Sequence, residues 1–183
     1  VCGVGFFGAG IYKSVFNKLV MKNYSTWSSM IKRCYDKKEQ EKTPTYKGVT
    51  VCEEWHNFQN FAKWFEDNYV EGWRLDKDLL YPDCKTYSPE TCCFIPHEIN
   101  MQFTERTRRY LTGISKVGNS FAVKISINGK IIHLGHFKTI EEASFAYQKA
   151  RKEYIKTLAE KYKNELPEQV YQALINYQVQ IID

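Results

Sequence analysis

The chain has 183 residues, of which 43% are hydrophobic and 15% aromatic, and this is enough apolar material for one or two small domains with real cores. The formal net charge of +5 and the pI of about 8.8 are compatible with a nucleic-acid partner, but they are weaker than a strongly basic signature. No apolar run is long enough to span a bilayer, and residues 1–10 lack the basic flank and cleavage site of a signal peptide. We therefore expect neither a signal peptide nor a membrane partner.

The six cysteines are spread along the chain and form no Cys-x-x-Cys pair, so the usual zinc signature is missing. Without a signal peptide, reduced and mostly buried thiols are a better interpretation than disulfides. The alternative is a scattered metal site that combines a histidine with some of Cys34, Cys52, Cys84 and Cys92.

Two helices are predicted in the first seventy residues. Apolar residues three or four apart indicate a helix over 25–35, capped by Ser25, and a second helix over 55–69. Between them we expect a solvated loop over 36–47 and a short strand over 49–52. The aromatic stripe of the second helix is typical of a core rather than of a base-stacking platform, because stacking residues must stay exposed.

Residues 73–101 predict a strand, a loop, a second strand and a short helix. Asp76 and Asp78 end the first strand, Ser88-Pro-Glu-Thr-Cys precedes the second, and Asn100 lies early in the helix that starts near His97. This arrangement resembles a divergent His-Asn-His (HNH) nuclease unit. The N-terminal part as a whole resembles bacteriophage proteins of the homing-endonuclease type.

An HNH nuclease needs a histidine as general base and a metal ion held by Asp, Asn or His. The resemblance implies that an active enzyme would use Asp76, Asp78, His97 and Asn100, with Mg²⁺ on Asp76 and Asp78. The first strand ends without the histidine, however, and loss of a general base costs a factor of about 10² to 10⁴. We therefore expect a degenerate unit, kept as structure or as a DNA clamp. Two alternating aspartates are also typical of a plain solvated strand edge.

Residues 110–137 alternate apolar and polar side chains, with breaks at Gly118-Asn119 and Asn128-Gly129. This pattern predicts three antiparallel strands near 111–116, 120–128 and 130–137, and Asn-Gly is the strongest signal for a type I′ hairpin turn. On the second strand the residues divide between two faces: Phe121, Val123, Ile125 and Ile127 on one, and Ala122, Lys124 and Ser126 on the other.

A helix follows the third strand. Thr139 is a suitable N-cap, and Glu141 and Glu142 suit the positive end of the helix dipole. Its small-residue stripe allows close packing on one face of the sheet and comprises Ala143, Ala146, Tyr147 and Ala150. The other face of the sheet is then left free.

Four segments carry a second resemblance: Tyr110-Leu-Thr-Gly-Ile, Phe121-Ala-Val-Lys-Ile, Gly129-Lys-Ile-Ile-His-Leu-Gly-His-Phe and Glu141-Glu-Ala-Ser-Phe-Ala-Tyr. Together they resemble the APETALA/ethylene-response-factor DNA-binding domain, in which the free sheet face lies in the DNA major groove. The matching positions are Thr112, Ser115, Lys124, Ser126, Ile131 and His133. That family usually has Arg and Trp at several of them, so guanine recognition by bidentate Arg is weakened here. The alternative is an ordinary exposed sheet.

Basic residues flank this sheet. Arg106, Arg108 and Arg109 precede it, and Lys116 and Lys124 lie within it, so we expect all five to contact phosphates, which positions a protein without specifying sequence. A solvated linker is the alternative for the three arginines. After the sheet and its helix, Pro167 indicates the start of a further helix, and 177–182 alternates like an edge strand.

The predicted fold class is α+β, with a degenerate HNH-like helical and ββα domain over 1–104 and an APETALA-type domain with a helical extension over 105–183. The predicted function is phage-type binding of double-stranded DNA, read in the major groove by the 109–137 sheet, in the cytoplasm of a host bacterial cell. The alternatives are an active, Mg²⁺-dependent DNA endonuclease and a phage factor that binds a host protein. The sequence gives neither the DNA target nor the oligomeric state.

Overall fold

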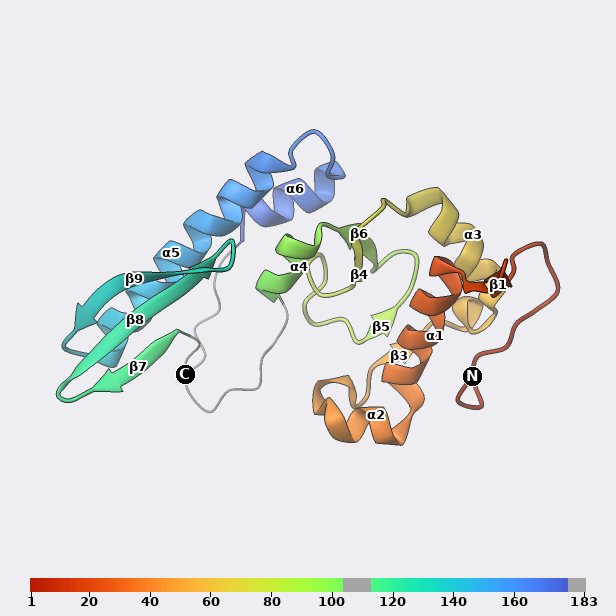
Figure 1. Ribbon diagram of the computed structural model, residues 1–183, viewed down its shortest axis with the longest axis horizontal. Helices are drawn as coiled ribbons and strands as arrows, with labels where there is room; N and C mark the ends of the chain where they lie inside the picture. Colours follow the sequence, from red (N-terminus) through yellow and green to blue (C-terminus); the bar gives the residue numbers. More distant parts are fainter. Residues whose placement is uncertain (104–112, 178–183) are drawn as a thin grey trace. The chain divides into compact units, whose positions relative to one another are not determined.

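The computed structural model describes residues 1–103 and 113–177 and has the predicted mixed α+β architecture (Figure 1). The chain forms two compact units, Val1–His97 and Glu98–Asp183. The division therefore falls within helix α4 (His97–Phe103) rather than between 104 and 105. The physical reason is that α4 is tied to the second unit: Arg151 donates to the carbonyl oxygen of Gln102, and Lys161 pairs with Glu98.

The core of the first unit lies between α1 (Lys22–Tyr35) and α3 (Phe58–Asn68), and the aromatic stripe of α3 is buried as predicted. Trp27 on α1 donates from its indole nitrogen to the carbonyl oxygen of Trp55 over 2.7 Å. The predicted cap of α1 is wrong. Ser25 lies inside the helix, where its hydroxyl donates to the carbonyl oxygen of Lys22 at 2.9 Å, and α1 begins three residues earlier.

The prediction of a loop over 36–47 is also wrong. Residues Lys37–Lys42 form α2, because the Asp36 side chain accepts the backbone N–H groups of Lys38 and Glu39 and so caps a short helix. A 3₁₀ turn, η1 (Pro44–Tyr46), follows. A second 3₁₀ turn, η2 (Glu53–His56), occupies the start of the second predicted helix, so that α3 itself begins at Phe58.

The strands of the first unit are short. The predicted strand over 49–52 is β3 (Thr50–Val51), which pairs in parallel with β5 (Thr86–Tyr87). Strand β4 (Arg74–Asp76) pairs antiparallel with β6 (Cys93–Ile95), and α4 follows, which confirms the predicted order of strand, loop, strand and helix. Near the N-terminus, β1 (Val15–Phe16) and β2 (Leu19–Val20) form a hairpin.

The second unit contains the predicted three-stranded sheet in the order β7 (Ile114–Val117), β8 (Ser120–Ile127) and β9 (Lys130–Phe137). Asn128 and Gly129 have φ values of 50° and 74°, as the predicted type I′ turn requires. Helix α5 (Ile140–Lys161) runs along the sheet (Figure 1), and Thr139 and Glu142 form a capping box at its start.

Helix α6 (Glu168–Ile175) follows α5 and begins directly after Pro167, as predicted. It packs on α5, and its buried residues are Val170 and Leu174. The predicted edge strand over 177–182 lies outside the described residues, except for Tyr177.

One buried cluster of the second unit comprises Ile114, Val123 and Ala143, which join β7, β8 and α5. Half-buried apolar side chains surround it: Phe121, Leu134, Phe137 and Tyr147. The hairpin turn at the far end of the sheet is held as well, because the Tyr154 hydroxyl of α5 donates to Asn128 Oδ1 at 3.0 Å.

Gly113 marks the closest approach of β7 to its neighbours. It has a φ of +83°, and a Cβ atom there would lie 2.3 Å from the Lys124 carbonyl oxygen and 2.5 Å from the Tyr147 ring. Gly118 has a similar φ of +58° but no heavy atom within 4 Å of such a Cβ, which makes it a matched control.

We expect Gly118→Ala to lower the free energy of unfolding by about 1–2 kcal/mol, the cost of a left-handed backbone with a side chain. Gly113→Ala should lower it by roughly 1–3 kcal/mol more, because the added methyl group overpacks the sheet against α5. Denaturant unfolding of both variants measures the difference. Equal losses would mean that β7 does not approach the Lys124 carbonyl group and the Tyr147 ring as closely as the structure shows.

Candidate nucleic-acid interface

The face of the sheet opposite α5 carries polar side chains in register. Lys124 on β8 lies opposite His133 on β9, and Ser126 lies opposite Ile131. These residues alternate along β8 with Val123 and Ile125, which are buried on the side of α5. Lys124, Ser126, Ile131 and His133 are all exposed, and Ile131 reaches 69%. The free face therefore presents a cation, an imidazole, a hydroxyl and an apolar side chain side by side.

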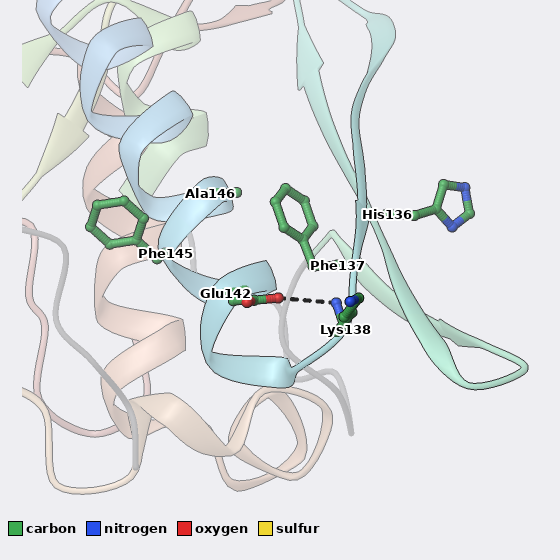
Figure 2. A pocket seen from close by; sticks show the side chains of 6 residues that line it. All are labelled: His136, Phe137, Lys138, Glu142, Phe145 and Ala146. Atoms are coloured by element: carbon green, nitrogen blue, oxygen red, sulfur yellow. Dashed lines mark hydrogen bonds between the residues drawn. The ribbon is translucent and has the colours of Figure 1, made fainter.

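A β-bulge in β9 changes which residues reach this face. Val123 pairs with Gly135 whereas Lys124 pairs with His133, so Leu134 is the extra residue on β9. Strict alternation would have put His133 and His136 on opposite faces. With the bulge, His136 points away from α5 while Phe137 points toward it (Figure 2).

His136 is thus a residue of the free face that the sequence analysis missed. The signal that could have found it is Gly135, since an isolated glycine within a strand pattern suggests a bulge. Ser115 and His136 flank Ala122 on the two neighbouring strands, so all three lie across the same face. Ala122 is buried between its longer neighbours, whereas Ser115 and His136 are exposed.

The other predicted DNA-contacting residues do not all gather here. Lys116 pairs with Phe121, whose ring packs into the core under α5. Because successive residues of a strand point to opposite faces, Lys116 lies on the opposite side of the sheet from Ser115, at an edge strand. The remaining predicted contacts lie outside the described residues: Arg106, Arg108, Arg109 and Thr112.

Charge is divided unevenly along the chain. Residues 1–35 contain five basic and no acidic side chains, 36–104 contain 8 basic and 13 acidic ones, and 105–183 contain 13 basic and 8 acidic ones. The middle block, which includes the ββα segment, therefore carries a net charge of −5, and each flanking block carries +5. Electrostatics favours a polyanion at the sheet and at the N-terminal block, and disfavours one at the ββα segment.

The predicted metal ligands of the ββα segment are engaged by the protein itself. Asp76 is only 6% exposed, and its Oδ2 accepts the backbone N–H groups of Asp78 at 2.9 Å and of Leu79 at 2.8 Å. The Asp78 carboxylate pairs with the buried ammonium group of Lys77, which also donates to the Cys84 carbonyl oxygen. Asp76 therefore caps the turn that follows β4, and Asp78 neutralises Lys77.

The other two predicted catalytic residues, His97 and Asn100, both lie on α4, three residues apart and so on neighbouring turns of one helix face. His97 is exposed. Within residues 1–103 and 113–177, no group of three or more His, Cys, Asp or Glu side chains is arranged to hold a metal ion.

All six cysteines are free thiols, as predicted, but only Cys34 and Cys92 are buried, and Cys2 is exposed. Burial raises the pKa of Cys34 to about 11 and that of Cys93 to about 12. Both thiols are therefore protonated at neutral pH, a state that is a poor nucleophile and a poor metal ligand.

Comparison with protein families, characterised proteins and solved structures gives no match for this chain. The HNH and APETALA resemblances accordingly stay predictions. Of the helices that the structure describes, none combines the length and the apolar character that crossing a bilayer requires.

The role of Asp76 as a cap can be tested by the free energy of unfolding of variants at this position. Asp76→Asn keeps an oxygen acceptor for both backbone N–H groups and should retain the fold, whereas Asp76→Ala should lower the free energy of unfolding by about 1–3 kcal/mol. Denaturant unfolding of both variants measures this. If Asn were as damaging as Ala, the negative charge rather than the acceptor would be what β4 needs.

Asp76 should also make stability depend on pH. Burial, the largest cause, raises the pKa of Asp76 above its ordinary value near 3.8, so the folded state holds the proton more tightly than the unfolded state. Relative to Asp76→Asn, the wild type should be most stable below pH 3.8 and lose this advantage as the pH rises through the raised pKa. Unfolding curves of the two proteins across this range measure the effect, and a constant difference would contradict it.

Proposed function

We propose that this chain is a double-stranded DNA-binding protein whose β7–β8–β9 sheet enters the major groove. The observation that carries the proposal is the division of the sheet into a face buried by α5 and an exposed face bearing the Lys124–His133 pair. The major groove is wide enough to admit β-strands, whose alternate side chains then reach base edges. The positive charge of residues 105–183 supports a polyanionic partner.

The residues of this face suit base contacts of different kinds. Lys124 can donate to the O6 and N7 acceptors of guanine, and Ile131 can contact the methyl group of thymine. His133 and His136 offer ring nitrogens that act as donors or acceptors, and the hydroxyls of Ser115 and Ser126 can do either. We place Arg106, Arg108 and Arg109 on the phosphates next to the sheet. In this proposal the protein is a phage-type DNA-binding protein that acts in the cytoplasm of a host bacterial cell.

The geometry supports DNA cleavage less than DNA binding. Asp76 and Asp78, the proposed Mg²⁺ ligands, are already bonded to a turn and to Lys77, so an active HNH-type enzyme would have to break these contacts. Incubation of supercoiled plasmid with Mg²⁺ decides the matter: we expect no nicked product, and nicking that disappears in Asp78→Ala would establish the nuclease instead.

Binding to a host protein is the remaining alternative, since the free face lacks the arginines of the family it resembles. Capture experiments from nuclease-treated host lysate separate it from DNA binding. A partner retained after nucleic acid is removed, and lost when Lys124 and His133 are changed, would replace DNA as the occupant of this face.

The sheet can be tested with a pair of variants that differ in the face they alter. Lys124→Ala with His133→Ala should weaken duplex binding by roughly 30-fold or more, because two base contacts of about 1–3 kcal/mol each contribute at least about 2 kcal/mol together. Lys116→Ala removes the same charge as Lys124→Ala but from the opposite side of the sheet, and should change affinity much less. A gel shift against a duplex selected from a random library measures both. Equal effects of Lys116→Ala and Lys124→Ala would exclude the proposed face.

A further inference from the structure

The β1–β2 hairpin of the first unit exposes apolar side chains on both of its faces. Val15 pairs with Val20, and Phe16 pairs with Leu19, so each pair occupies one face. All four are exposed, from 49% for Val15 to 71% for Leu19. Proteins rarely leave a contiguous apolar surface of this kind in water without a partner for it.

The hairpin is held firmly at its base. The Tyr12 backbone N–H donates to Gln59 Oε1 at 2.9 Å, the Gln59 amide donates back to the Tyr12 carbonyl oxygen at 3.0 Å, and the Tyr12 hydroxyl donates to Glu66 at 2.6 Å. On the other side, the Met21 N–H donates to the Ser14 carbonyl oxygen at 2.9 Å, and α1 begins at the next residue. Both ends of the hairpin are therefore fixed to the two helices of the core.

The turn at the tip is also well defined. Asn17 and Lys18 have φ values of 48° and 65°, the left-handed pair of a type I′ turn, which matches the twist of two paired strands. Two strands of two residues each are too short to be stable alone. This short hairpin is anchored at its base and exposes apolar side chains on both faces, which is typical of a binding element.

Charge narrows the choice of partner. Lys13, Lys18 and Lys22 are exposed along the hairpin, and residues 1–35 contain no acidic side chain. The first turn of α1, at the base of the hairpin, likewise has no acidic residue, so the helix dipole adds to the positive potential. A second copy of this hairpin would be repelled, whereas an anionic partner would be attracted.

The polar tip favours a nucleic-acid groove over a lipid surface. An apolar hairpin that enters a bilayer leads with its tip, and here that would carry Lys18 into the hydrocarbon at a cost of several kcal/mol. In a DNA groove the Phe16–Leu19 face of the hairpin can lie against the base steps, and the lysines lie near the rows of phosphates along the rims. Many proteins that bind the minor groove insert apolar side chains between base steps and bend the duplex.

We propose that the β1–β2 hairpin is a second DNA contact, an arm that enters the minor groove with Phe16 and Leu19 against the base steps and Lys13, Lys18 and Lys22 on the phosphates. The arm belongs to the first unit and shares no residue with the β7–β8–β9 sheet. The proposal goes beyond the proposed function of the sheet and does not depend on it.

The test uses the full chain and the salt dependence of duplex binding. Each phosphate contact contributes about 0.9 to the slope of log affinity against log salt, so Lys13→Gln, Lys18→Gln and Lys22→Gln together should reduce the slope by roughly 2.7. The matched control is Lys37→Gln, Lys38→Gln and Lys42→Gln, which removes the same charge from α2 and should leave the slope unchanged. A reduction of the same size in both variants would overturn the arm, because it would report net charge alone.

The apolar pair Phe16 and Leu19, here called the wedge, is tested by a separate measurement, the bend of the duplex. Phe16→Ser with Leu19→Ser should leave the salt slope intact, reduce the bend of the duplex measured by energy transfer between its ends, and weaken binding roughly 10-fold. Both side chains are more than half exposed, so the variant should keep the unfolding midpoint of the wild type, which is measured alongside. An unchanged bend and affinity would overturn the wedge.

Further comparisons show whether the hairpin or the sheet binds the duplex, and whether the hairpin binds DNA or a lipid surface. Loss of duplex binding in the hairpin variants but not in the Lys124/His133 variant would support the arm and remove the sheet from the DNA site. The reverse pattern would support the sheet and overturn the arm. Sedimentation with vesicles of one-third anionic phosphatidylglycerol, lost in the hairpin variants while duplex binding is unchanged, would assign the hairpin to a membrane surface instead.

Discussion

The contact between α5 and one face of the three-stranded sheet determines most of what the second unit can do. Ala143 packs directly on Ile114 and Val123, and Gly113 lets the backbone of β7 pass close to Tyr147. Because a side chain in a strand can point to only one of two faces, burying Val123 and Ile125 under the helix leaves Lys124 and Ser126 on the other side. The composition of the exposed face is therefore a consequence of how the core packs.

The β-bulge adds a second constraint on that face. The extra residue, Leu134, turns inward to the core, and the strand resumes with His136 facing outward. Two histidines separated by three positions thereby share a face with Lys124. A regular strand would have placed the two histidines on opposite faces, so the bulge changes which side chains the exposed face presents.

The uneven charge connects the two proposals about DNA. Each basic block carries one of the two proposed DNA contacts: the exposed face of the β7–β8–β9 sheet in one, and the β1–β2 hairpin in the other. The acidic block between them carries the ββα segment, whose aspartates serve a turn and a buried lysine. The two carboxylates predicted to hold a metal ion thus serve the stability of the protein itself.

The sequence alone predicts the structural features that depend on residues close together in the chain. These include the three strands, the Asn128-Gly129 turn, the capping box at Thr139 and the buried aromatic stripe of α3, because period-two alternation, turn chemistry and helical spacing are local properties. The helix α2 was missed although its cap, Asp36, is a local signal. The start of α1 was misplaced because its N-cap residue, Met21, makes no side-chain capping bond that a sequence pattern could reveal. The tertiary structure decided the burial of Asp76, the pairing that makes Leu134 the extra residue of the bulge, and the exposure of the β1–β2 hairpin. Gly135 is a local signal for the bulge, and strand alternation already puts Lys116 and Ser115 on opposite faces. Burial and exposure, by contrast, depend on which distant residues pack against a segment, and no pattern along a single chain carries that information.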